Sequence, residues 1–274
     1  MNKIDFSYAS KLEHNFAQRL IIKTIERITG KKKLEKLYIQ YSKKGYEPSK
    51  FWSDILKVLD IRVKNKSNND LLIPASGKLI IIANHPFGII DGLILCSLVS
   101  KQRSDFRIMT HETLKFLPQL EKYILPVDFS NSDKLSLKNN LLTAKKAKNH
   151  LINNGVLIVF PSGSVSVAKN LKEEAQDDEW KTFPAKLIHQ VKADVLPIFF
   201  DGKNGLLFHL FASKMKNSTL KYSSYIHETR KKIGKEISIY IGKKIKYDEI
   251  AHIKDRKLLT SFLKDHTYSL KNNE

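Results

Sequence analysis

One short segment of the chain carries a histidine and an aspartate at a spacing that could perform acid–base chemistry. The segment Asn84-His85-Pro86-Phe87-Gly88-Ile89-Ile90-Asp91-Gly92 follows the apolar run Leu79–Ala83 directly. A neutral imidazole can take the proton of an attacking hydroxyl, and a nearby carboxylate fixes its tautomer and stabilises the imidazolium that forms. Taken alone, a histidine and an aspartate this close are more often a structural turn, so the pair needs further support.

Two further segments could line the same site. Phe160-Pro161-Ser162-Gly163-Ser164-Val165-Ser166 follows the apolar run that begins at Val156, and it offers backbone N–H groups and hydroxyls to a polar ligand. Val195–Gly202 is an apolar run with Pro197 near its start and a turn signal at its end. Taken separately, Phe160–Ser166 predicts only a turn between a strand and a helix, and Val195–Gly202 predicts only a core strand.

The elements that must position these segments alternate along the chain. Apolar runs that predict strands are Leu79–Ala83, Phe106–Met109, Ile124–Val127, Val156–Phe160, Val195–Phe199 and Ile237–Ile241. Helical patterns cover about 91–101, 134–153, 182–192 and 254–270. This alternation predicts an α/β fold in which helices flank a central, mixed and largely buried sheet. In such sheets ligands gather beyond the carboxyl ends of the strands, where His85 is expected.

The N-terminal part has a different pattern. Residues 11 to about 60 are expected to be helical, with Leu20, Ile21, Ile22, Ile25 and Ile28 on a helical period and Gly30 as a stop signal. We therefore divide the chain into an N-terminal helical segment, 1–70, and an α/β domain, 71–274. The plainer interpretation of the first segment is an amphipathic helix packed on its own domain. The sharper one is an interfacial helix among lipid headgroups.

Composition narrows the partners and the location. The 274 residues carry a formal charge of +20, which calls for an anionic partner such as nucleic acid, an anionic membrane surface or an acidic carrier protein. Most of this charge comes from lysine rather than arginine, which favours a membrane surface or a carrier protein. The lone Cys96 excludes an intrachain disulfide and predicts a reducing, cytoplasmic-side location. The longest apolar stretch, Lys78–Ser100, is interrupted by polar residues, so we expect peripheral or monotopic membrane contact without a transmembrane span. The acidic segment Glu173–Glu179 is expected to be a solvated loop.

No metal or cofactor is predicted. The nine histidines are scattered, without a His-x-x-x-His pair and without a second cysteine to join them. For His227 and Glu228 we expect a structural role first, and a position beside the substrate as the second alternative.

Together, the three segments resemble the motifs of the glycerolipid acyltransferase superfamily, which includes lysophospholipid and glycerol-phosphate acyltransferases. The usual first motif is Asn-His with an aspartate five positions after the histidine. Here Asp91 lies six positions after His85, as in the His-Pro-Phe-Gly variant of a bacterial, hemolysin-like branch. The usual third motif, Phe-Pro-Glu-Gly-Thr-Arg-Ser, resembles Phe160–Ser166, and the fourth, an apolar stretch around a proline, resembles Val195–Phe200. The fold implied is that of the glycerol-phosphate acyltransferases.

The resemblance assigns roles by position. It implies that His85 is the general base and Asp91 its orienting partner, that backbone N–H groups after His85 hold the oxyanion, and that no acyl-enzyme forms. An acyl-CoA or acyl carrier protein thioester would be the co-substrate and a lipid would be the acceptor. The expected substrate-binding residues are Asn84, Pro86, Phe87, Gly88, Phe160, Pro161, Ser162, Gly163, Ser164, Ser166 and Pro197.

Departures from the third motif bear on the acceptor. Ser162 stands where the superfamily usually has glutamate and Val165 where it has arginine, and the second-motif region Leu125–Phe129 also lacks arginine. A phosphate would lose its bidentate partner. The sequence therefore favours a lyso-lipid acceptor, such as a lysophospholipid or a lyso-aminolipid, over glycerol 3-phosphate; 1-acylglycerol-3-phosphate is the alternative acceptor.

Other classes of protein remain open at this point. A serine hydrolase would use Ser162 or Ser164, but the chain has no Gly-x-Ser-x-Gly elbow. A non-catalytic protein that binds nucleic acid or membranes would account for the charge, yet the basic residues are spread along the chain, so no nucleic acid is expected. A catalytically inactive scaffold is a further alternative, which the presence of both His85 and Asp91 disfavours.

Overall fold

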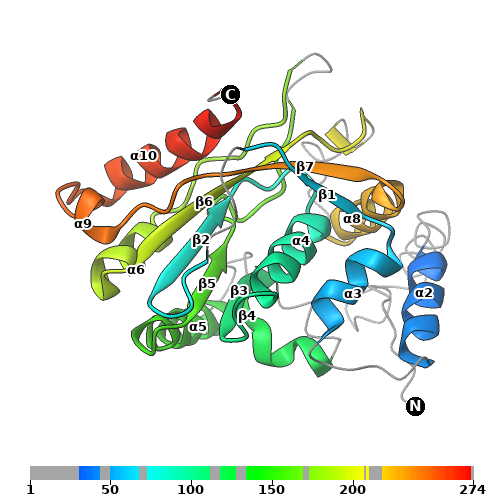
Figure 1. Ribbon diagram of the computed structural model, residues 1–274, viewed down its shortest axis with the longest axis horizontal. Coiled ribbons are helices and arrows are strands. Elements are labelled where there is room, and N and C mark those ends of the chain that lie inside the picture. The colour runs from blue at the N-terminus through cyan, green and yellow to red at the C-terminus, as the bar shows by residue number, and fades with distance from the viewer. Residues whose placement is uncertain are drawn as a thin grey trace.

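A seven-stranded mixed sheet forms the centre of the molecule (Figure 1). The structure is a computed structural model that describes residues 31–43, 50–67, 73–111, 118–127, 134–168, 173–206, 208–209 and 218–272. The strand order is β1-β7-β6-β2-β5-β3-β4, where β6 pairs with β7 antiparallel and every other neighbouring pair is parallel. The strands are β1 (Arg62–Asn65), β2 (Leu79–Ala83), β3 (Phe106–His111), β4 (Ile124–Val127), β5 (Val156–Val159), β6 (Asp194–Asp201) and β7 (Glu236–Ile241).

Helices cover both faces of this sheet. In Figure 1, α5, α6 and α10 lie on one side, and α2, α3, α4 and α8 lie on the other. The helices are α2 (Lys31–Lys43), α3 (Phe51–Val58), α4 (Ile89–Ser100), α5 (Lys134–Ile152), α6 (Phe183–Val191), α8 (Ser218–Lys232), α9 (Tyr247–Ile250) and α10 (Arg256–Ser269), with the 3-10 turns η4 (Pro118–Tyr123) and η5 (Leu270–Asn272). The predicted α/β class is therefore confirmed.

The central strand β2 shows why this sheet is buried on both faces. All five of its side chains are buried, and they alternate between two hydrophobic clusters. Leu79 and Ile81 join the cluster on the side of α3 and α4, whereas Ile80 and Ile82 join the cluster on the side of α5, α6 and α10. A strand that faces helices on both sides has no polar face, because successive side chains point in opposite directions.

One region near the N-terminus differs from the expectation drawn from the sequence. The short strand β1 was not predicted, because its sequence Arg-Val-Lys-Asn is polar and mostly exposed at the edge of the sheet. It pairs with β7, and Phe51 and Trp52 of α3 belong to the main hydrophobic cluster. The sheet thus includes residues from before the expected boundary at residue 70. The predicted apolar helix at Leu20–Ile28 lies outside the described residues.

One membrane-related observation concerns helix length. Across the ranges described above, none of the helices combines the length and the apolar character that crossing a bilayer requires.

Candidate active site

His85 and Asp91 meet where β2 ends and α4 begins. His85 Nδ1 lies 2.9 Å from Asp91 Oδ2. The same carboxylate oxygen accepts the backbone N–H groups of Phe87 at 2.9 Å and Gly88 at 3.0 Å. The five residues that separate His85 from Asp91 therefore form a turn whose own amides orient the carboxylate at the start of the helix.

The two partners differ in their access to solvent. The Asp91 side chain is completely buried, whereas 18% of the His85 side chain is exposed. Burial raises the pKa of Asp91, and the hydrogen bonds and charge of His85, followed by the backbone of Phe87 and Gly88, oppose that rise. With Nδ1 held by the carboxylate, Nε2 is the imidazole nitrogen that can accept a proton. Only the histidine can therefore reach a substrate.

The N–H groups that were expected to hold the oxyanion have another function in this structure. Those of Phe87 and Gly88 both donate to Asp91 Oδ2. The expectation is wrong for these two groups, because a backbone N–H that already points at a carboxylate is not directed at a developing oxyanion. Gly88 has φ 74°, and a Cβ there would lie 3.2 Å from Val165 Cγ2. Glycine is thus required both by the turn and by the segment packed against it.

The segment 160–166 packs directly against the turn from His85 to Asp91. The Phe160 ring stacks on the His85 imidazole with ring centroids 4.0 Å apart, and the Ser166 N–H donates to the His85 carbonyl at 2.9 Å. Ser162 is buried and its hydroxyl donates to the Ser164 carbonyl at 2.8 Å. The Ser164 hydroxyl donates to Asp178 Oδ2 at 2.7 Å. These contacts place the segment beside His85, with Phe160 limiting the orientations of the imidazole.

Asp177 is a buried carboxylate that the sequence interpretation missed. Its Oδ1 accepts the backbone N–H of His85 at 3.1 Å and the hydroxyl of Ser166, and its Oδ2 accepts the indole N–H of Trp180 at 2.7 Å. Burial raises the pKa of Asp177, and these donors oppose the rise. The prediction of a solvated loop at Glu173–Glu179 is therefore wrong for Asp177, because this carboxylate joins the turn that begins at His85 to the segment that contains Ser166.

Asn84 connects two strands behind the turn. Its Nδ2 donates to the Phe200 carbonyl at 2.9 Å, and its Oδ1 accepts the Phe200 N–H at 2.7 Å. The residue is 1% exposed, so its amide joins the end of β2 to the end of β6. That position suits a residue that holds the site together; contact between Asn84 and a substrate stays a prediction.

The three prolines and Phe87 complete the predicted set. Pro86, Phe87 and Pro161 are buried around the turn, and the Pro161 carbonyl accepts the Lys181 N–H at 2.9 Å. Pro197 lies inside β6 in register with Ile82, between the pairs Val195–Ile245 and Ile198–Ile241. The shift of one residue between those two pairs marks a bulge, a position where the missing N–H of proline is tolerated.

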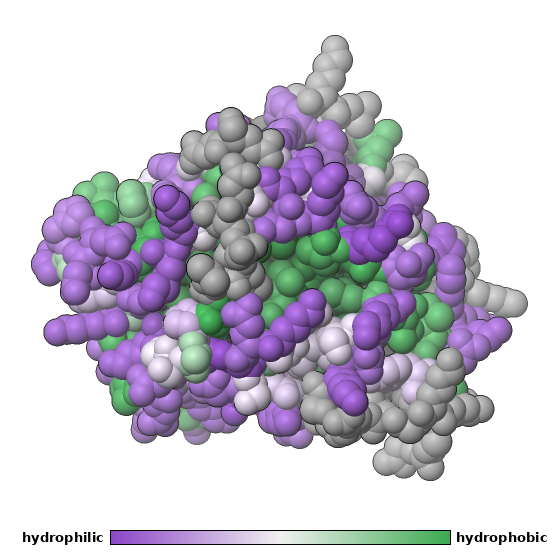
Figure 2. Space-filling view, in the orientation of Figure 1, coloured by the Kyte–Doolittle hydropathy of each residue, from purple (hydrophilic) through white to green (hydrophobic). Residues whose placement is uncertain are grey.

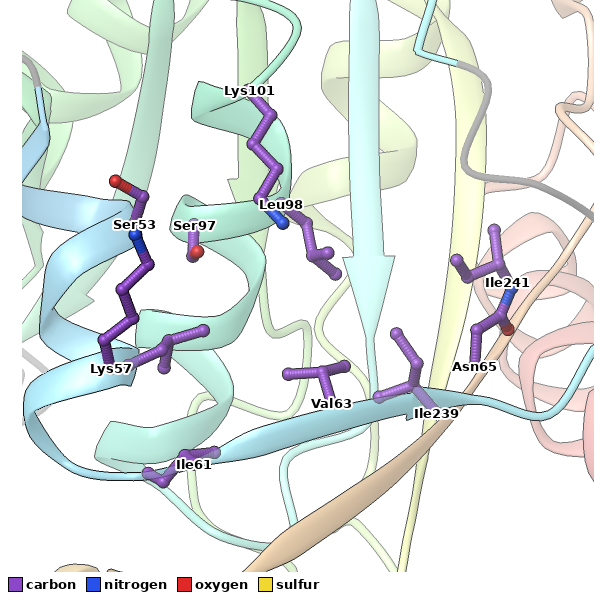
Figure 3. A pocket seen from close by; sticks show the side chains of 11 residues that line it. Ser53, Lys57, Ile61, Val63, Asn65, Ser97, Leu98, Lys101, Ile239 and Ile241 are labelled. Carbon is purple, nitrogen blue, oxygen red and sulfur yellow. The ribbon is translucent and has the colours of Figure 1, made fainter.

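A cavity of about 580 Å³ opens on the α3 and α4 side of the sheet. Figure 3 shows Ile61 and Val63 near β1, Leu98 on α4, and Ile239 and Ile241 on β7 around it. Other lining residues are Ser53, Leu56, Lys57, Asn65, Ser97 and Lys101. Figure 2 shows a green, hydrophobic hollow in the same region, bordered by hydrophilic side chains. Leu98 lies seven residues after Asp91, about 10 Å along the same helix at 1.5 Å per residue.

Comparison with known proteins shows the family to which the chain belongs. A family model described as Acyltransferase matches residues 7–274, so the chain belongs to this acyltransferase family. The superfamily resemblance drawn from the motifs is thereby confirmed.

In the described residues, no group of three or more histidine, cysteine or acidic side chains is arranged to hold a metal ion.

Individual relatives are more distant. The chain is 27% identical over 226 residues to a lyso-glycine lipid O-acyltransferase of Phocaeicola vulgatus, covering 80% of this chain and 77% of the relative. It is 25% identical to a protein of the same name from Bacteroides thetaiotaomicron, covering 80% and 79%. Its fold is similar to the 1-acyl-sn-glycerophosphate acyltransferase PlsC of Thermotoga maritima, with a TM-score of 0.50, 16% identity, and 82% and 77% coverage.

Proposed function

We propose that this protein is an O-acyltransferase that moves a fatty acyl group from a thioester donor to the hydroxyl of a lyso-lipid. The observation that carries the proposal is the 2.9 Å contact between His85 Nδ1 and the buried Asp91 carboxylate. This contact leaves Nε2 of a partly exposed imidazole as the proton acceptor, which is the arrangement that a general base requires. The donor would be acyl-CoA or an acylated carrier protein.

The proposed reaction needs no covalent enzyme intermediate. His85 Nε2 takes the proton of the acceptor hydroxyl as its oxygen attacks the thioester carbonyl, and Asp91 stabilises the imidazolium. The tetrahedral intermediate then collapses: the carbon–sulfur bond breaks, the new ester forms, and the imidazolium returns the proton to the departing thiolate. The buried hydroxyls of Ser162 and Ser166 already donate to the Ser164 carbonyl and to Asp177, which supports direct transfer over a serine nucleophile.

The acceptor we favour is a lyso-aminolipid. Two relatives are named for the O-acylation of a lyso-glycine lipid. In this chain Ser162 and Val165 replace the glutamate and arginine that related enzymes direct at a phosphate. Val165 is also buried against Gly88, so it serves packing. A lysophospholipid is the second acceptor, and 1-acylglycerol-3-phosphate is the alternative for which the PlsC-like fold provides only a general precedent.

The cavity beside α4 is the candidate site for an acyl chain. Its walls are mainly isoleucine, leucine and valine side chains, and it lies on the helix that carries Asp91. Burial of each methylene in such a site contributes about 0.8 kcal/mol. Lys57 and Lys101 also line the cavity, and they would suit the charged end of a lipid or of the donor.

The excess positive charge suits two proposed partners. A net charge of +20 would attract the protein to an anionic membrane surface on the cytoplasmic side, at about 1 kcal/mol per well-placed lysine. It would also steer an acidic acyl carrier protein toward the site. Peripheral attachment to the membrane is part of this proposal, and neither a metal nor a cofactor is required by the reaction.

An assay of acyl transfer with matched histidine variants tests the proposal. The full chain, His85→Ala and His252→Ala would be incubated with acyl-CoA or acylated carrier protein and a panel of lyso-aminolipids, lysophospholipids and glycerol 3-phosphate. We expect His85→Ala to lose on the order of 10²-fold or more in rate. His252 is exposed, and its variant should keep wild-type activity. Equal activity of all three proteins would remove His85 from the mechanism, and strong competition by glycerol 3-phosphate would reject the preferred acceptor.

A further inference from the structure

The loop that follows β6 borders the turn between His85 and Asp91. Gly202 has φ 127°, and a Cβ at this position would lie only 2.8 Å from Phe87 Cζ. The loop can approach this closely because glycine has no side chain. Gly202 therefore lies against the turn in which the Phe87 N–H donates to Asp91.

The C-terminal end of α8 holds this loop through charged side chains. Glu228, which is 2% exposed, accepts the Gly205 N–H at 2.7 Å through Oε2 and pairs with Lys231 at 3.1 Å through Oε1. Lys232 donates to the Lys203 carbonyl at 3.1 Å. A buried glutamate and two lysines therefore surround a loop that is itself in contact with the active site.

Among these side chains, Lys232 is the one that contacts the turn between His85 and Asp91. Its ammonium lies 4.3 Å from the centroid of the Phe87 ring. Burial lowers the pKa of Lys232, and the negative charges of Glu228 and Asp91 oppose that effect. A half-buried ammonium has lost part of its hydration, so an anionic ligand that reaches it is bound more strongly than at an exposed lysine.

Asn204 supplies an independent observation beside Lys232. It is 4% exposed, and within the described part of the chain neither its amide nitrogen nor its amide oxygen has a hydrogen-bond partner. The carbonyl that Lys232 contacts belongs to the peptide bond leading into Asn204. A buried polar group without a hydrogen-bond partner destabilises a fold, and such groups are few in native structures.

We propose that Lys232 and Asn204 form the headgroup site of the acceptor, and that this site takes an amino acid acylated on its nitrogen. Lys232 binds the headgroup carboxylate, which has only acceptor atoms to match the three donors of an ammonium. The Asn204 amide pairs with the headgroup amide, because each offers one donor edge and one acceptor edge. The inference rests on the proposed function and specifies the acceptor class for it.

Binding tests the headgroup site without turnover. An N-acylglycine without a hydroxyl cannot be acylated, and its affinity in uncharged detergent micelles can be measured by calorimetry. The matched probes are the N-acylglycinamide, which lacks the carboxylate, and the O-acyl glycolate, which lacks the amide N–H. We expect wild type to bind the N-acylglycine roughly 10-fold or more tightly than the glycinamide, as for loss of a charged hydrogen bond.

The variants assign each preference to one residue. Lys232→Met should abolish the preference for carboxylate over glycinamide and Lys232→Arg should restore part of it. Asn204→Leu should abolish the preference for N-acylglycine over the glycolate ester. Lys235→Met removes an exposed lysine three residues after Lys232 and should retain both preferences. Circular dichroism and thermal unfolding would establish that each variant is folded.

The outcomes separate the site from the function. A wild type without a carboxylate preference, or a preference that persists in Lys232→Met, overturns the headgroup site. If the expected binding pattern appears while no lyso-aminolipid is acylated, the headgroup site stands and the proposed acceptor reaction fails. If acylation of lyso-aminolipids proceeds equally well in wild type and Lys232→Met, the reaction stands and the headgroup site is rejected.

Discussion

The Asp177 carboxylate accepts the backbone N–H of His85 at 3.1 Å, although the two residues are 92 positions apart along the chain. The same oxygen accepts the Ser166 hydroxyl, and Ser166 in turn donates its N–H to the His85 carbonyl. Both polar groups of the His85 backbone are thus held by residues of other segments. Asp177 is, on this geometry, a positioning residue for the proposed base.

Asp177→Asn should reduce turnover on the order of 10-fold or more, because a small displacement of a catalytic group is costly. The asparagine side chain would direct its NH2 group at one of the three groups that now donate to Asp177, which are the His85 N–H, the Ser166 hydroxyl and the Trp180 indole N–H. We expect the loss in kcat with little change in KM for the acceptor, measured well below the melting temperature. Glu179→Gln, at an exposed position two residues later, is the control and should behave as wild type. An equal kcat in Asp177→Asn would mean that the carboxylate serves stability alone.

Ser162→Ala should retain activity close to that of wild type. The Ser162 hydroxyl is buried and donates to the Ser164 carbonyl at 2.8 Å, so its removal should cost about 1 kcal/mol of stability. The rate of acyl transfer and mass spectrometry after treatment with an alkyl phosphonate check this expectation. A covalent adduct on a serine, together with an inactive Ser162→Ala, would favour the hydrolase mechanism.

Asp91→Asn should separate activity from stability. Activity should fall by 10²-fold or more, because a neutral amide does not stabilise an imidazolium. Burial raises the pKa of Asp91 above its ordinary value of 3.8. The folded wild type then binds this proton more tightly than the unfolded chain, so this group's contribution to stability falls as pH rises from about 3.8 through the raised pKa.

The pH dependence of unfolding provides the measurement for Asp91. Asparagine does not titrate, so the free energy of unfolding of Asp91→Asn relative to wild type should increase as pH rises through that window. Urea titrations of both proteins at a series of pH values test the sign. A difference that stays constant, or that decreases with pH, contradicts a raised pKa at Asp91.

Asn84→Ala should destabilise the fold by about 2 kcal/mol or more, because it leaves the buried N–H and carbonyl of Phe200 without partners. Urea-induced unfolding measures this loss. Asn149→Ala is the control, because Asn149 is an exposed residue of α5. It measures the effect on stability of replacing an asparagine that is not buried. Equal stability of the two variants would argue against the bridge between β2 and β6.

Leu98→Trp should shorten the acyl chain that the enzyme prefers. A larger side chain would fill part of the cavity of about 580 Å³ that Leu98 lines. Displacing two methylenes would lower kcat/KM for a long-chain donor by roughly 10-fold, at about 0.8 kcal/mol for each. Rates with donors of graded chain length measure the effect. An unchanged chain-length profile in a folded variant would place the acyl chain elsewhere.

Local patterns in the sequence were sufficient for the main features of the fold and for the His85–Asp91 pair. Strands such as Leu79–Ala83 are short apolar runs because both of their faces are buried, and burial on two faces leaves a clear signal. His85 and Asp91 are close in sequence, so a single turn between strand and helix brings them together. The edge strand β1 left no such signal, because it is polar and its side chains are mostly exposed.

Only the tertiary structure could point to the functions proposed for Asp177, Lys232 and Asn204. Asp177 belongs to an acidic stretch that resembles a solvated loop, and its burial depends on Trp180 and on segments distant in the chain. The contact of Lys232 with the Phe87 ring similarly joins α8 to a turn from the first half of the domain. A sequence pattern reports the average environment of neighbouring residues. The environment of a single charge depends on which distant segments fold against it, and that is decided by the packing of the whole chain.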